Sequence, residues 1–368
     1  MATGALDRIE GSTAKKKLFR RSRPGGWPDH SQRIRHIFQG AFVVLNAWLG
    51  AQFFLWVRYF ERGGQGLRVP RPAGVEGWLP IAGMMNTKAF LSTGRVPAIH
   101  PAAMFLFMAF ILMSLVAKKA FCSWLCPVGT LSEALWKLGR KLFRRNFQLP
   151  RWLDLPLRGL KYVLLGFFVF VVGAMSAEAL GEFMATPYGL IADVKMLNFF
   201  RGMGETAVVV IAVLLGGSIL VKNFWCRYLC PYGALMGLVS LLSPVKIRRD
   251  VEACIDCAKC AKACPASLHV DRLVQIRSVE CAACMECIAV CPAQDALQLA
   301  LPPARAAAPA RRWLHRALSP AVVACLIAYI FFGMVLLARA TNHWQTHIPN
   351  EVYLDLIPHA KDVTHPGM

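Results

Sequence analysis

Five apolar stretches constrain the fold of this 368-residue chain more than any other feature. Each is close to the length, about 20 residues, that a helix needs to cross roughly 30 Å of hydrocarbon. Only 17% of the residues are charged, which is too few for an ordinary soluble domain. The sequence therefore predicts an α-helical integral membrane protein with about five transmembrane helices, at residues 37–57, 101–117, 160–180, 206–221 and 319–338.

The distribution of basic residues predicts how these helices are oriented. Residues 1–36 carry nine Lys and Arg against three acidic residues, and residues 118–161 carry ten against two. Basic loops of membrane proteins face the cytoplasm, and the loop after the third stretch is acidic. We therefore expect a multi-pass protein of the bacterial inner membrane with a cytoplasmic N-terminus and an outer C-terminus. The first outer loop is an exception, with six basic residues: Arg58, Arg62, Arg68, Arg71, Lys88 and Arg95.

The formal charge of +21 also raises nucleic acid as a partner. The basic residues flank the apolar stretches, however, and do not form one binding face. The pattern indicates the membrane as a partner and no nucleic acid.

Two cysteine motifs follow the fourth apolar stretch, at residues 254–265 and 281–292. Both read C-x2-C-x2-C-x3-C-P, the spacing of bacterial ferredoxins that hold two [4Fe–4S] clusters, in which the fourth cysteine of each motif ligates the other cluster. The spacing predicts a small cytoplasmic α+β domain of the bacterial 2[4Fe-4S] ferredoxin type over residues 246–300. One cluster is expected on Cys254, Cys257, Cys260 and Cys291, and the second on Cys281, Cys284, Cys287 and Cys264.

Zinc and disulfides are the alternatives for these eight cysteines. Structural zinc sites pair short C-x2-C knuckles and do not need the doubled motif that ends in proline. Disulfides are disfavoured on the reducing side of the membrane, where the charge pattern places this domain.

A second pair of cysteine motifs, here called the cassettes, follows the second and fourth apolar stretches. The first reads FCSWLCPVGTL from Phe121, and the second reads WCRYLCPYGAL from Trp225. Their cysteines are Cys122 and Cys126, then Cys226 and Cys230, at a constant offset of 104 residues. The offset indicates a parallel internal repeat, with one unit over residues 37–140 and the other over residues 141–245.

Three interpretations of the cassettes remain open. The cysteines are core residues beside a Pro-x-Gly that ends a helix, or each pair is a redox dithiol or a copper(I) transit site. In the third interpretation the two pairs converge into one four-cysteine site for a further iron–sulfur centre or a metal ion. We favour the third, because the repeat supplies the required symmetry.

The combination of FCSWLCP, WCRYLCPYG and the double ferredoxin motif resembles a family of membrane-bound polyferredoxins. The family includes the quinol dehydrogenase membrane subunit of periplasmic nitrate reduction, the nitrous-oxide reduction regulator and a cytochrome oxidase accessory protein that reduces copper. The resemblance implies electron exchange between the quinone pool and a redox protein partner, with quinone as a further cofactor. The alternative that it implies is a copper reductase or accessory factor in respiratory-enzyme assembly, acting through the cassette thiolates.

The remaining segments give weaker expectations. An Ala/Pro linker, residues 301–318, leads to the fifth span and to an outer tail, residues 339–368, with His343 and His347 four residues apart. Cys325 is expected to be a buried, inert thiol. Two broken apolar segments suggest an outer quinone pocket, for which the candidate proton-handling residues are Lys88, Arg95, His100, Glu178, Glu182 and Asp193.

Overall fold

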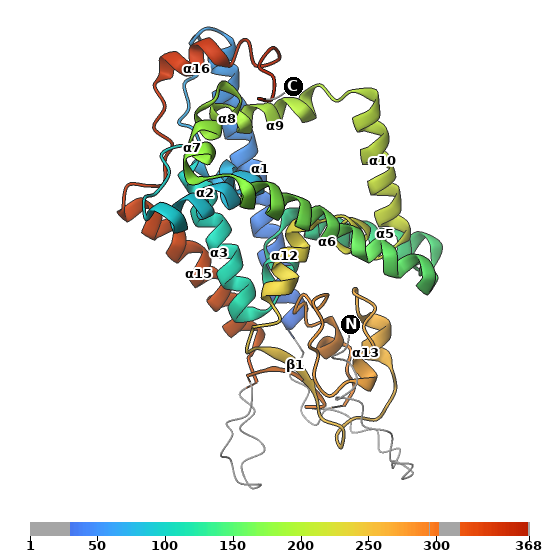
Figure 1. Ribbon diagram of the computed structural model, residues 1–368. Helices are drawn as coiled ribbons and strands as arrows, with labels where there is room; N and C mark the ends of the chain where they lie inside the picture. The colour runs from blue at the N-terminus through green and yellow to red at the C-terminus, as the bar shows by residue number, and fades with distance from the viewer. Residues whose placement is uncertain (1–29, 294, 302–316, 367–368) are drawn as a thin grey trace. The chain divides into compact units, whose positions relative to one another are not determined.

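The structure is a computed structural model that describes residues 30–293, 295–301 and 317–366, shown in Figure 1. Most of the basic N-terminal segment and of the Ala/Pro linker lies outside the described residues. The chain divides into two compact units, which we treat separately. The first unit consists of the described residues of Met1–Gly40, Leu112–Arg151 and Ser218–Ala328. The second consists of Ala41–Ile111, Trp152–Gly217 and the described residues of Tyr329–Met368.

Long apolar helices dominate the described chain. Three of them are long and apolar enough to cross a membrane: α1 (Ser31–Glu61), α6 (Arg151–Ala174) and α15 (Pro320–Ala340). The pair α9 (Ala192–Arg201) and α10 (Glu205–Leu220) meets the same test together, with a bend of 82° between its members. The second predicted stretch corresponds to α3 (Pro101–Ala117), which is apolar but shorter. The described residues therefore hold three or four candidate spans and one short apolar helix.

The third predicted stretch, residues 160–180, extends past the end of the helix that the structure shows. Helix α6 stops at Ala174, and Ser176 begins a new helix, α7 (Ala177–Ala185), by accepting a hydrogen bond from Ala179 N at 3.1 Å. Lys88 provides hydrogen-bond donors for free carbonyl groups at the end of α6. Its Nζ donates to the carbonyls of Val172 and Gly173 at 2.9 and 2.7 Å. A cation at a helix C-terminus is favourable, since free carbonyls gather there.

Short helices complete the second unit. Aromatic rings form much of its core, where Trp56 packs edge-on against Tyr353 with ring centroids 4.9 Å apart. A Cβ on Gly83 would lie 2.8 Å from Ala103 O, so only glycine permits this approach to α3. The short elements are η1 (Ala73–Trp78), α2 (Pro80–Thr93), α7, α8 (Pro187–Leu190) and α16 (Asn350–Leu356).

The first unit contains the cassettes and the cysteine-rich region. The cassettes form the helix pairs α4 (Ala120–Trp124) with α5 (Pro127–Phe143) and α11 (Phe224–Tyr228) with α12 (Pro231–Val239). In the cysteine-rich region, strands β1 (Lys246–Arg249) and β2 (Leu297–Ala300) pair antiparallel, with Lys246 opposite Ala300. Between the strands lie three short helices: α13 (Lys259–Ala263), η2 (Val270–Arg272) and α14 (Glu286–Ala289). This region is the small α+β part of the fold.

Candidate iron–sulfur sites

The two ferredoxin motifs share an unusual backbone conformation. Asp256 and Ala258 have φ values of 51° and 54°, and Ala283 and Met285, at the matching positions, have 50° and 58°. Left-handed φ is unfavourable for residues with a Cβ and persists where the surrounding structure requires it. Both loops therefore curve tightly at the same two places, as a chain does when it wraps around a bound group.

The first predicted ligand set lines one pocket. Cys254, Cys257, Cys260 and Cys291 all border it, together with the side chains of Ile255 and Asp271. Burial raises the pKa of the Cys260 thiol to about 11, while the backbone N–H of Ala261 acts in the opposite direction. A backbone donor aimed at sulfur stabilises a thiolate, which is the form that binds iron.

The four cysteines of the second predicted ligand set also lie near one another. The pKa of the Cys287 thiol is raised by burial and then by Cys284, Cys281 and Cys264, the other three members of the set. Burial likewise raises the pKa of Cys284 to about 12, although the Arg35 charge opposes this. Such thiols stay protonated at neutral pH when they are unbound, so iron binding must release their protons.

The residues present fit two [4Fe–4S] clusters. Each set offers four thiols from two segments of the chain, and backbone N–H groups point at Cys260, Cys264 and Cys284. None of the thirteen cysteines forms a disulfide. Among the described residues, no three His, Cys, Asp or Glu side chains are close enough to hold a single metal ion. The ligands of a cubane bind different iron atoms and lie further apart than the ligands of one ion.

The two cassettes have matching local geometry. Cys126 and Cys230 each cap the helix that follows, and their Sγ atoms accept from Gly129 N at 3.5 Å and Gly233 N at 3.2 Å. The backbone N–H of each of these cysteines donates five residues back, to Phe121 O or Trp225 O, both at 3.0 Å. Proline at the first helical position needs no N–H partner, so Cys-Pro starts a helix in both repeats.

The cassettes lie together in the first unit. Phe121 of the first packs edge-on against Tyr232 of the second, with ring centroids 6.0 Å apart. The pKa of Cys226 is raised by burial and then by Cys230, Cys126 and Cys122. Cys226 therefore lies within electrostatic range of the other three cassette thiols.

A buried lysine lies among these thiols. Lys119 is 5% exposed, and its Nζ is 3.4 Å from the point that a Cβ on Gly233 would occupy. Burial alone would lower its pKa, but Cys122, Glu280, Cys230 and Cys226 raise it overall. At the matching position of the second repeat the residue is Asn223. The buried cation Lys119 is thus supplied by the first repeat and has no lysine counterpart in the second.

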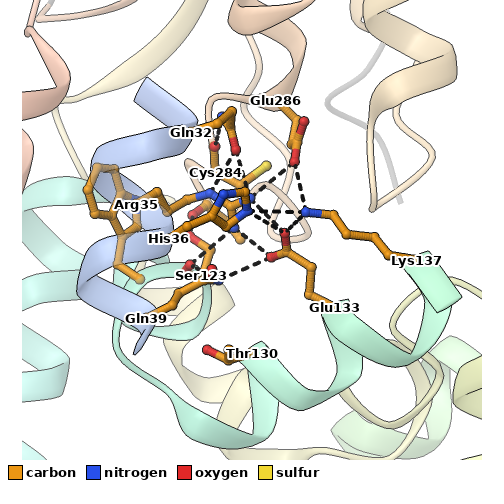
Figure 2. A network of polar contacts seen from close by, with 12 residues as sticks. Gln32, Arg35, His36, Gln39, Ser123, Thr130, Glu133, Lys137, Cys284 and Glu286 are labelled. Atoms are coloured by element: carbon orange, nitrogen blue, oxygen red, sulfur yellow. Dashed lines mark hydrogen bonds and ion pairs between the residues drawn. The ribbon is translucent and has the colours of Figure 1, made fainter. Parts of the chain in front are cut away.

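Figure 2 shows the polar network beside the first cassette. Arg35, at the start of α1, pairs with Glu133 of α5 and with Glu286 of α14, at 2.6 and 3.1 Å. Lys137 is 2.5 Å from Glu133. Gln39 Nε2 donates to Ser123 O at 2.9 Å, inside the first cassette. The network joins the first apolar helix, the first cassette and the second ferredoxin motif.

The second unit holds a buried polar cluster that only partly matches the predicted quinone residues. His100 Nδ1 is 3.2 Å from Glu76 Oε1, and Arg71 is 2.8 Å from Glu76 and 2.7 Å from Asp193. Burial opposes charge on Glu76, yet Arg71 and His100 lower its pKa to about 2. Thr346 Oγ1 also donates to Glu76 Oε1, at 2.7 Å.

The structure thus brings together two of the six candidate proton-handling residues, His100 and Asp193. Arg95, Glu178 and Glu182 take no part in this cluster, and Lys88 caps α6. Sequence reasoning missed Arg71 and Glu76 as members. The isolated excess of charge in the first outer loop was the available signal for Arg71.

Two smaller expectations concern the C-terminal part. Cys325 is exposed on α15, so the prediction of a buried thiol is wrong for the isolated chain. His343 Nδ1 is buried without a hydrogen-bond partner in the described residues, whereas His347 is exposed. The described chain does not join these two histidines in a metal-binding group.

Comparison with known proteins supports the assignment of these motifs. A family model described as a 4Fe-4S binding domain matches residues 99–146 and again residues 204–250, once around each cassette. A model described as a 4Fe-4S dicluster domain matches residues 246–292. The double match agrees with the internal repeat. No solved structure matches the chain.

Relatives extend the match over most of the chain. YccM of Escherichia coli (strain K12), provisionally named as an electron transport protein, is 50% identical over 331 residues, which cover 90% of this chain and 91% of YccM. The chain belongs to the polyferredoxin family. The ferredoxin-type protein NapH of the same organism is 28% identical to this polyferredoxin, over 73% of this chain and 88% of NapH. The regulatory protein NosR of Pseudomonas aeruginosa is 32% identical, over 46% of this chain and 23% of NosR.

Proposed function

We propose that this polyferredoxin transfers electrons in a membrane through [4Fe–4S] clusters. Cys254, Cys257, Cys260 and Cys291 would hold one cluster, and Cys264, Cys281, Cys284 and Cys287 the other. A bound [4Fe–4S] cluster accepts and releases one electron at a time, at a potential set by charge, hydrogen bonds to sulfur and solvent exposure. The observation that carries the proposal is the grouping of the eight cysteines into these two sets, one of them lining a single pocket.

A third centre is proposed at the cassettes, on Cys122, Cys126, Cys226 and Cys230. Three observations support it: the mutual range of the four thiols, the buried Lys119 among them, and the match of a 4Fe-4S binding domain to each repeat. A buried cation is costly without a counter-charge. Four thiolates around an iron–sulfur centre would supply that charge.

The membrane arrangement that we propose has five crossings, a parallel repeat, cytoplasmic cysteine motifs and an outer C-terminus. The short helix α3 and the bent pair α9–α10 then supply the second and fourth crossings. The buried pairing of Arg71 with Glu76 and Asp193 supports this orientation, because it removes a free positive charge from the exceptional outer loop.

Quinone is the exchange partner that we propose on the membrane side, with a redox protein as the other partner. The resemblance to the quinol dehydrogenase subunit motivates this assignment. Oxidation of a quinol releases two protons with its two electrons. Among the described residues of the second unit, the buried imidazole of His100, paired with Glu76, is the group that we propose takes up a proton.

Anaerobic iron and sulfide analysis with low-temperature EPR tests the cluster assignment. Two cubanes contain about eight irons, and a third centre raises the content further. A variant with Cys122, Cys126, Cys226 and Cys230 all changed to Ala should lose only the excess. Cys325→Ala is the matched control, because Cys325 lies outside every motif. Equal iron content in the quadruple variant and the control would contradict the third centre. The cassette cysteines would then act as thiols.

A second experiment separates quinone exchange from the copper alternative. The reconstituted protein is mixed in its reduced form with a quinone analogue and in its oxidised form with a quinol analogue. In a separate experiment the reduced protein is mixed with copper(II). The cluster absorbance is followed in each case. Quinone exchange predicts a rapid response to the quinone couple alone. A response only to copper(II) would replace it with the accessory-factor function.

A further inference from the structure

The two ferredoxin motifs have different surroundings within the first unit. The loop that begins at Cys281 is hydrogen-bonded to the first cassette. Ser123 Oγ donates to Ala282 O at 2.5 Å, and Trp124 Nε1 donates to Ala283 O at 3.2 Å. Both donors lie between the two cysteines of the first cassette. The loop is thus attached directly to the cassette.

The second repeat and the start of α1 contact the same ligand set. Lys222 Nζ donates to Lys262 O at 3.1 Å and to Cys264 O at 3.5 Å. Gln32 Nε2 donates to Cys284 O at 2.9 Å (Figure 2). Segments that carry Cys264 and Cys284 are therefore held by both repeats and by α1. These contacts join the second set of cysteines to the membrane-associated helices.

The first set of cysteines lies toward solvent in the described chain. Cys257 is exposed, Cys254 and Cys291 are half-buried, and only Cys260 is buried. In the second set, three of the four cysteines are buried and Cys284 is half-buried. Solvent exposure therefore separates the two sets as clearly as their contacts do.

We propose that the surface around Cys257 is the docking site for a soluble one-electron carrier protein, and that the Cys264 and Cys281–Cys287 segments face the cassettes. The proposal rests on the proposed function, in which both cysteine sets hold clusters. It assigns the two cysteine sets to opposite roles. The first set faces the soluble partner, and the second set faces the membrane-associated cassettes.

The chemistry of this surface suits a brief encounter with another redox protein. Ile255 and Val290 are 38% and 37% exposed and adjoin ligand residues of the first set. Electron-transfer complexes are small and short-lived, so a few apolar contacts around a redox centre are sufficient. The two charged residues that line the pocket, Arg249 and Asp271, are opposite in sign, in contrast to the basic chain.

EPR power saturation with a soluble gadolinium chelate tests the two sides. All 368 residues of the chain are present in the tested protein. Of the two ferredoxin ligand sets, Cys287→Ser leaves only the first complete, and Cys260→Ser leaves only the second. We expect the chelate to raise the half-saturation power several-fold more in Cys287→Ser than in Cys260→Ser.

Equal or reversed effects of the chelate would overturn the proposal. If a variant does not retain its remaining cluster, the intact protein answers the same question, because its most and least affected signals can be compared directly. Absence of any [4Fe–4S] signal from the intact protein would instead contradict the proposed function. The two failures are therefore distinguishable.

Docking is tested separately with Ile255→Lys, which places a charge in the apolar contact area. The probes are a reduced flavodoxin, which must dock, and the methyl viologen radical, which is too small to need a docking surface. We expect the flavodoxin rate to fall about five- to tenfold, as at contact residues of protein interfaces, while the viologen rate and the EPR spectrum stay unchanged. An unchanged flavodoxin rate would show that the carrier docks elsewhere.

Discussion

Arg35 and Glu133 form a two-pronged ion pair, with Nη1–Oε2 and Nη2–Oε1 distances of 2.6 and 2.7 Å. The Arg35 side chain is 1% exposed and Glu133 is 14% exposed, so the pair is largely withdrawn from water. It joins the beginning of α1 to α5, and Glu286 connects it to the second ferredoxin motif. Within the first unit, this pair holds together segments that are about one hundred and two hundred and fifty residues apart in sequence.

Glu133→Gln should destabilise the first unit by about 3 kcal/mol, because removal of one partner leaves a buried guanidinium with less compensation. Thermal denaturation in detergent measures the loss. Lys141→Gln is the control, since Lys141 is an exposed residue of the same helix. A midpoint equal to that of the control would show that Glu286 alone suffices to pair Arg35.

The same pair predicts an acid-sensitive step. Burial would raise the pKa of Glu133, but Arg35 and Lys137 lower it from 4.5 to about 2. A carboxylate with a lowered pKa contributes stability above its unfolded value, and this contribution is lost as pH falls through the folded value. We expect thermal stability to decline between about pH 4.5 and pH 2, and Glu133→Gln to show a weaker decline. Parallel curves for the two proteins would contradict this origin.

The two cassette glycines should differ in their tolerance of a side chain. A Cβ on Gly129 would lie 2.2 Å from Cys122 O, which is backbone, whereas one on Gly233 would meet the flexible end of Lys119 at 3.4 Å. Gly129→Ala should therefore cost about 2 kcal/mol or more and reduce iron incorporation. Gly233→Ala, at the matching position, should be nearly neutral. Iron content and melting temperature of the two variants give the comparison, and equal effects would contradict it.

Arg71→Met should strongly destabilise the second unit, because Glu76 and Asp193 would remain buried without their shared counter-charge. Loss of one partner from such a group costs about 3 to 5 kcal/mol. Arg68→Met changes an exposed arginine of the same loop and serves as the control. Chemical denaturation in detergent would reveal the difference. A stable Arg71→Met protein would mean that the carboxyl groups are neutral in the folded chain.

Lys119→Met should shift the midpoint potential of the cassette centre to more negative values, because a nearby positive charge favours the reduced, more anionic form. An EPR-monitored redox titration measures the shift, and iron content confirms that the centre is retained. Lys141→Met removes an exposed lysine and should leave the potential unchanged. A potential unaffected by Lys119→Met would place the centre away from this ammonium.

Motifs with a fixed spacing were the part of this molecule that the sequence predicted best. The eight ferredoxin cysteines carry their own local pattern, and a 4Fe-4S dicluster domain matches the segment that contains them. The division of these cysteines into two ligand sets stays a prediction. Hydrophobic length likewise located the apolar helices, but it could not locate the end of α6. That end depends on Ser176, which starts a new helix inside an apolar run, and on Lys88, which is distant in sequence.

The buried polar cluster of the second unit could not be predicted from sequence patterns. Arg71 and Asp193 are 122 residues apart, and neither belongs to a repeated or spaced pattern. Each looks like an ordinary loop charge until the chain is folded. Their pairing is a tertiary property, and only the surplus of arginine in a loop expected to be poor in positive charge gave a sign of it.

The exposure of Cys257 has a consequence for the handling of this protein in air. A ligand sulfur that water reaches is also reached by dioxygen and peroxide, which oxidise accessible thiolates stepwise to sulfenic and sulfinic acids. Damage should begin at the first cysteine set and reach the buried second set later. Aerobic purification would then yield a protein that lacks a cluster at the first cysteine set and has lost electron exchange through that surface.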